Sequence, residues 1–284
     1  MIIFFEWGKL GNQLFQYQGL RKHFPEHEII FFGCEELKNY FDNVLASFVI
    51  IKPHLKKVLF YLLKNFFLLL VKLKVIGEIK SLSKDEHKLY IHRGLFFNIY
   101  FAHSIFFQHN NCIKDIIDFP IIKKKFLNFS KDWLKKKKIF FYKKRLVFVH
   151  IRRGDYLIWP STKFPAAVKL SWYKKAMQII GYKIKKPIFI IMSDDLSYIK
   201  SVFKESNCVI ISNNETAVDL AIMSMCSYGI LSPSSFAWWG AFFARSTNTS
   251  KNFSYFIAIK YWAGHQLKKW FPRNFQANWI TYIK

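Results

Sequence analysis

The second half of the chain alternates short apolar runs with longer amphipathic segments. The apolar runs predict buried strands at 146–150, 187–192, 208–211 and 228–232. The segments between them predict helices near 171–181, 195–204, 215–226 and 237–244. Strands and helices that alternate in this way form a parallel sheet with helices on its faces. The hydrophobic pattern therefore predicts an α/β domain of the kind that binds nucleotides.

The first half of the chain opens with the same alternation. Mostly apolar runs at 1–5 and 28–32 predict two strands. Between them a glycine-bounded turn at 8–12 leads into a helix that begins at Gln13. The pattern predicts that this half is also α/β.

A lysine-rich stretch at 131–145 predicts the junction between two domains, over 1–140 and 141–284. The first domain contains a basic amphipathic insertion at 55–75. At 100° per residue, one side of a helix over this insertion carries Lys57, Lys64 and Lys72. Its apolar run is too short to span a bilayer, because Lys64 interrupts it. Two roles fit the pattern: an interfacial helix on an anionic membrane, or a helix docked on the protein core.

The formal net charge of +26 over 284 residues favours anionic partners such as nucleotide diphosphates, lipid headgroups or nucleic acid. Residues 220–284 contain no Asp or Glu. Four scattered cysteines indicate a reducing compartment and argue against a zinc site. Residues 1–5 lack the basic start of a signal peptide. These features predict a cytoplasmic protein, at most peripheral on the inner face of the cytoplasmic membrane.

The residues that follow the strand at 146–150 carry the clearest chemistry. His150-Ile151-Arg152-Arg153-Gly154-Asp155 places two arginines at the carboxyl end of a strand, where open α/β sheets bind their ligands. Arginine presents a planar fork of donors that matches phosphate oxygens. The motif predicts capture of a diphosphate, and the alternative is a basic turn with a solvated Arg-Asp ion pair.

Two further motifs lie where a predicted strand meets a helix. Asp194 and Asp195 end one strand, and they either cap the next helix or contact the base or ribose of a nucleotide. Ser234 and Ser235 precede another helix, where hydroxyl and backbone N–H groups either cap it or hold a phosphate.

The ordered set of motifs resembles the family 11 glycosyltransferases, the bacterial and animal α1,2-fucosyltransferases. It comprises residues 8–17 (GKLGNQLFQY), 150–156 (HIRRGDY), 189–195 (FIIMSDD), 215–226 (ETAVDLAIMSMC) and 232–241 (SPSSFAWWGA). The likeness runs from residue 8 to residue 280. The chain departs from the usual pattern at Lys9, Pro233 and Ala237.

The resemblance implies a GT-B-like α/β fold with two Rossmann-like halves that face a cleft, the first half on the acceptor side and the second binding a GDP-sugar. It also implies an inverting, metal-independent fucosyltransferase without a cofactor other than its donor substrate. Fucose would pass from GDP-β-L-fucose to the 2-hydroxyl of a galactose-terminated surface glycan, such as a lipopolysaccharide O-antigen.

The resemblance further implies which residues form the site. Arg152 and Asp155 are the predicted catalytic residues, with Arg152 supplying charge to the departing diphosphate. The predicted donor-binding residues are Gly11, Asn12, His150, Arg152, Arg153, Asp194, Asp195, Ser234, Ser235 and Phe236. Because side chains alternate along a strand, Arg153 is expected to point away from Arg152 and to brace the loop through Asp155. The base is left open among Asp155, Glu6, a histidine and no base.

The rival interpretation is a basic nucleic-acid-binding or membrane-binding protein without transferase activity. A nucleic-acid-binding module would interleave basic and aromatic residues in a recognisable fold, and the lysine runs do not show this. We therefore expect no nucleic acid among the partners. GDP binding in moderate salt favours the transferase, whereas binding that is indifferent to GDP and lost steeply with salt favours the rival.

Overall fold

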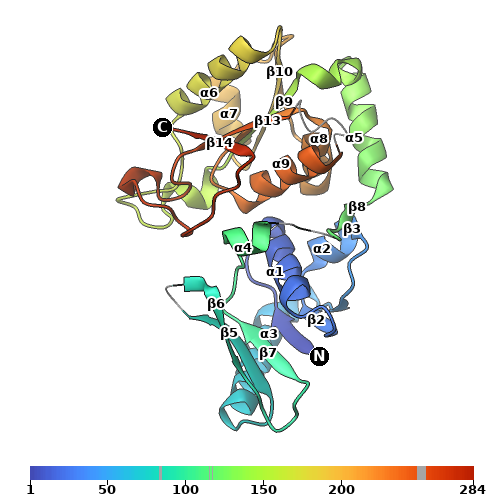
Figure 1. Ribbon diagram of the computed structural model, residues 1–284. Helices are drawn as coiled ribbons and strands as arrows, with labels where there is room; N and C mark the ends of the chain where they lie inside the picture. The colour runs from blue at the N-terminus through green and yellow to red at the C-terminus, as the bar shows by residue number, and fades with distance from the viewer. Residues whose placement is uncertain (83–84, 115, 117, 248–253) are drawn as a thin grey trace. The chain divides into compact units, whose positions relative to one another are not determined.

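The computed structural model describes residues 1–82, 85–114, 116, 118–247 and 254–284 (Figure 1). It divides into two compact units, Met1–Ile121 and Ile122–Lys284. Each unit contains a six-stranded sheet of its own. The chain is therefore α/β in both halves.

The first unit contains β1 (Ile2–Phe5), α1 (Leu10–His23), β2 (Ile29–Phe32), α2 (Glu35–Tyr40), β3 (Phe41–Asp42), β4 (Ser47–Val49), α3 (Pro53–Lys72), β5 (Gly77–Leu82), β6 (Asp85–His92), β7 (Tyr100–His103) and α4 (Asn110–Ile113). Its sheet has the order β4-β2-β1-β7-β5-β6, and β6 pairs antiparallel with β5 while the other pairs are parallel. Strand β1 is buried over its whole length, as expected for a central parallel strand.

The second unit begins next to β8 (Ile121–Ile122) and contains α5 (Lys124–Lys136), η1 (Phe140–Arg145), β9 (Leu146–Ile151), η2 (Gly154–Leu157), α6 (Leu170–Lys183), β10 (Ile188–Ser193), α7 (Leu196–Val202), β11 (Val209–Ile211), α8 (Thr216–Met225), β12 (Tyr228–Leu231), α9 (Ser235–Thr247), β13 (Tyr255–Ile259), η4 (His265–Leu267) and β14 (Ile280–Ile283). Its sheet is wholly parallel, in the order β11-β10-β9-β12-β13-β14. Numbered along this unit, the order is 3-2-1-4-5-6, as in Rossmann domains.

Helices cover both faces of the second sheet (Figure 1). Helices α6 and α7 pack on the face that bears Val147, Val149 and Ile151. On the other face α8 and α9 approach closely, since a Cβ at Gly240 would lie 2.3 Å from the sulfur of Met223. Strands buried on both faces explain why the sequence shows continuous apolar runs there.

The strands and helices that the pattern predicted in the second half are confirmed to within a few residues. Two strands that close the sheet, β13 and β14, were not predicted. In the first half α1 begins at Leu10, so Gly11 and Asn12 lie in its first turn and not in a turn before it.

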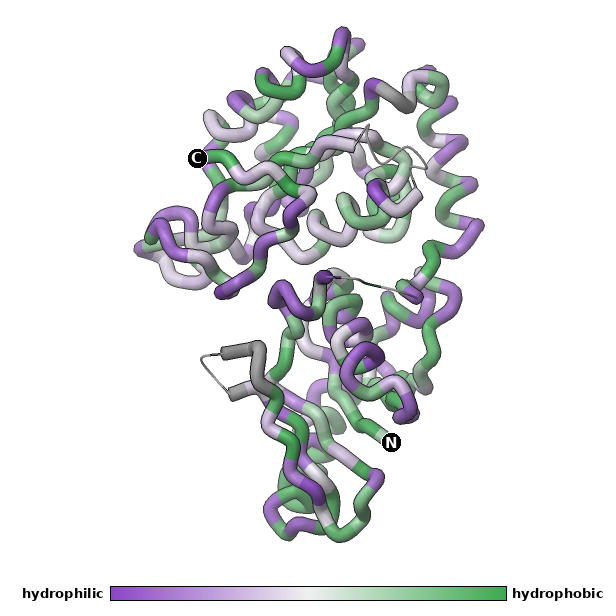
Figure 2. Tube along the Cα trace, viewed as in Figure 1, coloured by the Kyte–Doolittle hydropathy of each residue, from purple (hydrophilic) through white to green (hydrophobic). Residues whose placement is uncertain are grey.

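The division between the units lies earlier than the sequence indicated, between Ile121 and Ile122. Most of the lysine-rich stretch at 131–145 belongs to α5 and η1, which are ordered parts of the second unit. The Ser130 hydroxyl donates to the Val218 carbonyl of α8 at 3.1 Å. Hydrophilic and hydrophobic turns alternate along α5 (Figure 2), because the helix buries one face and exposes its lysines.

Helix α3 contains residues 55–72 of the predicted 55–75 insertion and has two apolar faces. One face packs on the first sheet, where Phe60 and Phe67 contact Phe5 at centroid distances of 5.3 and 6.0 Å. The outward face exposes Leu55, Val58, Leu62, Phe66 and Leu69, with side chains 45–59% exposed. Docking on the core is thus confirmed for one face, and the other face is exposed among the residues of the unit that the structure describes. Among the described residues, no helix is long and apolar enough to cross a bilayer.

Candidate active site at the carboxyl edge of the second sheet

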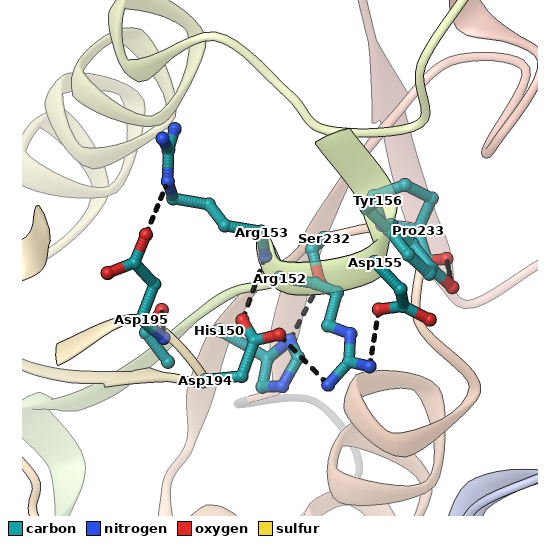
Figure 3. Close-up of polar contacts among 10 residues, drawn as sticks. His150, Arg152, Arg153, Asp155, Tyr156, Asp194, Asp195, Ser232 and Pro233 are labelled. Atoms are coloured by element: carbon teal, nitrogen blue, oxygen red, sulfur yellow. Dashed lines mark hydrogen bonds and ion pairs between the residues drawn. The ribbon is translucent and has the colours of Figure 1, made fainter. Parts of the chain in front are cut away.

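Four neighbouring strands of the second unit end in polar residues at one edge of the sheet. Strand β9 runs into Arg152, β10 into Asp194, β11 into Ser212 and β12 into Ser232. The strand order reverses between β9 and β12, and ligands of open α/β sheets bind at this topological switch point. His150 bridges it, with Nδ1 and the Ser232 Oγ 2.7 Å apart (Figure 3).

Arg152 is held between two carboxylates from different strand ends (Figure 3). Its Nη2 lies 2.5 Å from Asp155 Oδ1, and its Nη1 lies 3.1 Å from Asp194 Oδ2. The Arg152 side chain is 15% exposed, whereas that of Asp155 is 58% exposed. The guanidinium is therefore fixed in position while one of its two partners lies largely in solvent.

Arg153 points away from Arg152, as expected, and binds a different carboxylate (Figure 3). Its Nε donates to Asp195 Oδ2 at 3.1 Å, and its guanidinium carbon lies 3.5 Å from the centroid of the Tyr198 ring. The prediction that Arg153 braces Asp155 is wrong. The 3-10 turn that begins at Gly154 brings Asp155 back to Arg152, three residues earlier.

Gly154 allows the two strand ends to approach. A Cβ at this position would lie 2.4 Å from the Asp194 carboxylate, which is closer than real Cβ atoms come. The same carboxylate accepts the backbone N–H of Arg153 at 2.8 Å. Any larger residue at 154 would push Asp194 away from Arg152.

His150 is a neutral member of this cluster. Burial lowers its pKa to about 3, and the positive charge of Arg152 acts in the same direction. The Phe236 ring lies 5.5 Å from the imidazole. His150 therefore contributes a hydrogen bond and shape to the strand edge, not a charge.

The remaining residues predicted in the second unit surround this cluster. Asp195 caps α7, since its Oδ1 accepts the Tyr198 N–H at 3.1 Å, and this hydrogen bond is the main reason that its pKa is lowered. The Ser234 N–H donates to the Ser232 carbonyl at 2.7 Å, and α9 begins at Ser235. The capping interpretation thus holds for Asp195. Asp194 instead binds the Arg152 guanidinium and the Arg153 backbone N–H.

Gly11 and Asn12 belong to the other unit, in the first turn of α1 after β1. The Asn12 Oδ1 accepts a hydrogen bond from Gln108 Nε2 at 2.8 Å. The structure thus gathers eight of the predicted site residues at one edge of the second sheet: His150, Arg152, Arg153, Asp155, Asp194, Asp195, Ser234 and Phe236, with Ser235 next to them. Among the described residues, no group of three or more His, Cys, Asp or Glu side chains is placed to hold a metal ion.

The model of glycosyl transferase family 11 matches residues 7–284, which includes every motif at this edge. The chain belongs to glycosyl transferase family 11.

The relatives that this family 11 glycosyltransferase matches are named as glycosyltransferases. The O-antigen biosynthesis glycosyltransferase WbnK of Escherichia coli is 25% identical over 92% of this chain and 95% of its own length. An α-1,2-colitosyltransferase of Escherichia coli is 34% identical over 34% of this chain and 35% of its own. Galactoside α-(1,2)-fucosyltransferase 2 of Rattus norvegicus is 25% identical over 34% of this chain and 29% of its own.

Solved structures confirm a GT-B-like α/β fold with two parallel-sheet domains. A family 9 glycosyl transferase from Veillonella parvula superposes with a TM-score of 0.53 at 10% identity, covering 90% of this chain and 80% of that one. POFUT1 in complex with GDP superposes with a TM-score of 0.51 at 12% identity, covering 88% of this chain and 95% of that one.

The family 11 glycosyltransferase also holds a partly buried acid at this edge that sequence reasoning did not assign to the site. Asp219 lies on α8, and its Oδ1 accepts the Ser212 hydroxyl at the end of β11 at 2.5 Å. Burial raises the pKa of Asp219 to about 7, against the opposing hydrogen bonds from Ser212 and Asn214. The signal available in the sequence was one acid in the otherwise apolar first turns of a helix that follows a strand.

Proposed function

We propose that this glycosyltransferase transfers L-fucose from GDP-β-L-fucose, with inversion, to the 2-hydroxyl of a terminal galactose in a surface glycan such as a lipopolysaccharide O-antigen. The observation that carries the proposal is Arg152, fixed at the switch point of a Rossmann-like sheet in a family 11 chain. Relatives named as α1,2-fucosyltransferases and an α-1,2-colitosyltransferase support the linkage, and WbnK supports an O-antigen acceptor.

The charges at the site support binding of a diphosphate through an exchange of anions. The Arg152–Asp155 pair is weak, because Asp155 lies mostly in solvent and exposed ion pairs contribute about 0–1 kcal/mol. A β-phosphate oxygen would replace Asp155 at Nη2, while Asp194 continues to hold Nη1. Since the guanidinium is already oriented, its interaction with the departing GDP requires little reorganisation.

The other residues of the edge support this arrangement. Arg153 and Asp195 fix the start of α7, while His150 and Ser232 join the strands on the two sides of the switch point. Ser234 and Ser235 lie at the first turn of α9, where helix N–H groups favour an anion. In this proposal fixed cations and helix dipoles carry the leaving-group charge, and the reaction needs no metal ion.

We also propose that the outward face of α3 binds the anionic surface of the cytoplasmic membrane. A second segment extends this face, because the Leu95 and Phe96 N–H groups donate to the carbonyls of Lys74 and Val75 at 2.7 and 3.0 Å. Leu95, Phe96 and Phe97 are 55–72% exposed. Between residues 43 and 77 the sequence has no acid, and although Lys56 pairs with Glu6 and Glu35, basic residues such as Lys57 and Lys72 flank the apolar surface.

The experiment that tests the transfer incubates the protein with GDP-fucose and galactose-terminated oligosaccharides in the presence of EDTA. We expect a product that an α1,2-specific fucosidase removes. GDP-colitose and GDP-mannose test the donor, since one relative is named as a colitosyltransferase. Absence of transfer from any GDP-sugar would contradict the proposal. Transfer from GDP-colitose alone would show that the donor is GDP-colitose and not GDP-fucose.

A further inference from the structure

The first unit contains a cavity of about 210 Å³ at the carboxyl ends of β1 and β7. Helix α3 forms its other wall. Aromatic rings, that of Trp7 among them, form much of its lining, and its polar side chains include Glu6, Lys64, His103 and Ser104. Small-molecule sites are mostly apolar, with a few polar groups that fix orientation, and drug-sized sites span roughly 300–1,000 Å³. A smaller cavity of this composition suits a single sugar ring.

Residues outside the cavity fix the position of the Glu6 carboxylate in its wall. Glu6 Oε2 accepts the Cys34 N–H at 2.7 Å, and its Oε1 pairs with Lys56 at 2.5 Å. Trp7 is 45% exposed, and its ring centroid lies 4.1 Å from that of Phe106. A fixed carboxylate accepts hydrogen bonds from hydroxyls, and an exposed indole offers a flat apolar surface to the C–H face of a sugar.

His103 has the arrangement of an oriented base. Its Nε2 lies 2.9 Å from Glu78 Oε1, and its Nδ1 lies 3.1 Å from the Ser104 hydroxyl. Glu78 is nearly buried and also pairs with Lys80 at 2.8 Å. Burial by itself raises the pKa of Glu78, but the hydrogen bonds from Lys80 and His103 outweigh this, and the net pKa is lowered. An ionised Glu78 accepts from Nε2–H, which leaves the lone pair of His103 on Nδ1, toward Ser104.

The backbone at Ser104 supports a functional role for this end of β7. Ser104 has a φ of 58°, in the left-handed region that non-glycine residues seldom occupy. Such conformations recur at active sites, where the surrounding structure holds them. The Phe101 ring stacks on His103 with a centroid distance of 5.2 Å and fixes the imidazole plane.

We infer that this cavity binds the terminal sugar of the acceptor and that His103, positioned by Glu78, takes the proton from the sugar hydroxyl that reacts. The inference rests on the proposed function. The acceptor O–H bond breaks and its proton moves to Nδ1 of His103. The oxygen forms the bond to C1 of the transferred sugar, and the C1–O bond to phosphate breaks with its electron pair leaving on GDP. Protonated His103 then returns the proton to solvent.

The charged and titratable groups that face His103 come from three elements: Glu78 and Lys80 on β5, Glu6 after β1, and Tyr61 and Lys64 on α3. Glu78 is the group in direct contact, so it is the positioning residue. Removal of its charge by Glu78→Gln is expected to shift the pH–rate profile while leaving donor affinity unchanged.

The test compares His103→Gln with His23→Gln, a matched change at an exposed histidine outside the cavity. We expect His103→Gln to lower kcat for transfer about 10²- to 10⁴-fold, the range for loss of a general base, and to abolish the acidic limb of the pH–rate profile. GDP binding and slow hydrolysis of GDP-fucose by water should persist. His23→Gln should retain wild-type transfer.

A second measurement uses the wild-type protein, so that it does not depend on the folding of a variant. Diethyl pyrocarbonate modification is followed by mass spectrometry at His103 and His23, with and without a galactose-terminated oligosaccharide. Protection of His103 alone supports the inference. Unchanged modification of His103, or wild-type kcat and pH profile in folded His103→Gln, overturns it. Loss of GDP binding in the wild type would overturn the proposed function instead.

Discussion

Glu78 in the first unit and Asp219 in the second are carboxyls withdrawn at least in part from solvent, and their pKa values move in opposite directions. Burial is the largest influence on each and raises the pKa. Glu78 receives hydrogen bonds from Lys80 and His103, and its net pKa is lowered. Among the described residues, the hydrogen bonds to the Asp219 side chain come from a hydroxyl and an amide, and its pKa rises to about 7. Hydrogen bonds from Lys80 and His103 thus favour the charged form of Glu78, whereas burial favours the neutral form of Asp219.

The same contrast separates the two sheet edges. At the second edge the cations are fixed by Asp155, Asp194 and Asp195, and a neutral histidine and an acid with a raised pKa lie beside them. At the first edge an ionised acid orients a histidine within an aromatic cavity. One kind of fold thus presents an edge suited to an anion and an edge suited to a neutral sugar.

The largest expected effect concerns Asp219. If it is not observed, the contrast between the pKa values of Glu78 and Asp219 is wrong. A carboxyl with a pKa of about 7 when folded and an ordinary value of 3.8 binds a proton more tightly in the folded state. Its stabilisation is complete below about pH 4 and is lost as the pH rises through 7, by roughly 4 kcal/mol in all. Because Asp219→Asn cannot titrate, the stability of the wild type relative to this variant should fall by that amount between pH 4 and pH 8.

Urea unfolding of both proteins across this pH range measures the difference. The matched control is Asp132→Asn, because the Asp132 side chain is 64% exposed on α5. Its difference from the wild type should stay flat. A flat difference for Asp219→Asn as well would show that this acid is ionised in the folded protein.

Arg152→Ala removes the fixed cation from the second edge. We expect turnover to fall about 10²- to 10³-fold, as when one preorganised donor is lost from a transition state. Arg152→Lys keeps the charge but loses the fork of donors, so it should retain part of the activity. Steady-state transfer from GDP-fucose measures both, and a folded, fully active Arg152→Ala protein would contradict the mechanism.

The outward face of α3 is tested by the triple change of Lys57, Lys64 and Lys72 to Gln. Each lysine near an anionic surface contributes about 1 kcal/mol, so binding to phosphatidylserine vesicles should weaken roughly a hundredfold. Flotation at low salt measures it, with Lys169, Lys174 and Lys175 changed to Gln on the second unit as a control of equal charge. A wild-type protein that stays out of the vesicle fraction would contradict the proposal.

Arg153→Ala should affect stability more than chemistry, since Arg153 binds Asp195 and stacks on Tyr198. A partly exposed ion pair and a cation–π contact each contribute about 1 kcal/mol, so Tm should fall by a few degrees. Thermal unfolding and donor affinity are measured for Arg153→Ala and compared with the same measurements for Arg152→Ala. A loss of turnover as large as that of Arg152→Ala, without loss of stability, would show that both arginines contact the donor.

Much of the second unit was predictable from the sequence, because its strands are buried on both faces and read as continuous apolar runs. Strands β13 and β14 were missed since no clear helix separates them. Arg152, Asp194 and Ser232 were predictable as neighbours because parallel strands end at one edge. The partner of Arg153 was not, because the 3-10 turn at Gly154 decides which aspartate each arginine meets. His103, Glu78 and Lys80 come from two strands in a region without a readable pattern.

The measurement that tests the central claim most directly is calorimetric titration of GDP into the wild type, Arg152→Ala and Asp155→Asn, in moderate salt with EDTA. If a phosphate replaces Asp155 at Arg152, Asp155→Asn should bind GDP as tightly as the wild type or a few-fold more tightly, since a competing anion is removed. Arg152→Ala should bind it markedly more weakly. Equal GDP affinity in the wild type and Arg152→Ala would contradict the assignment of this sheet edge as the diphosphate site.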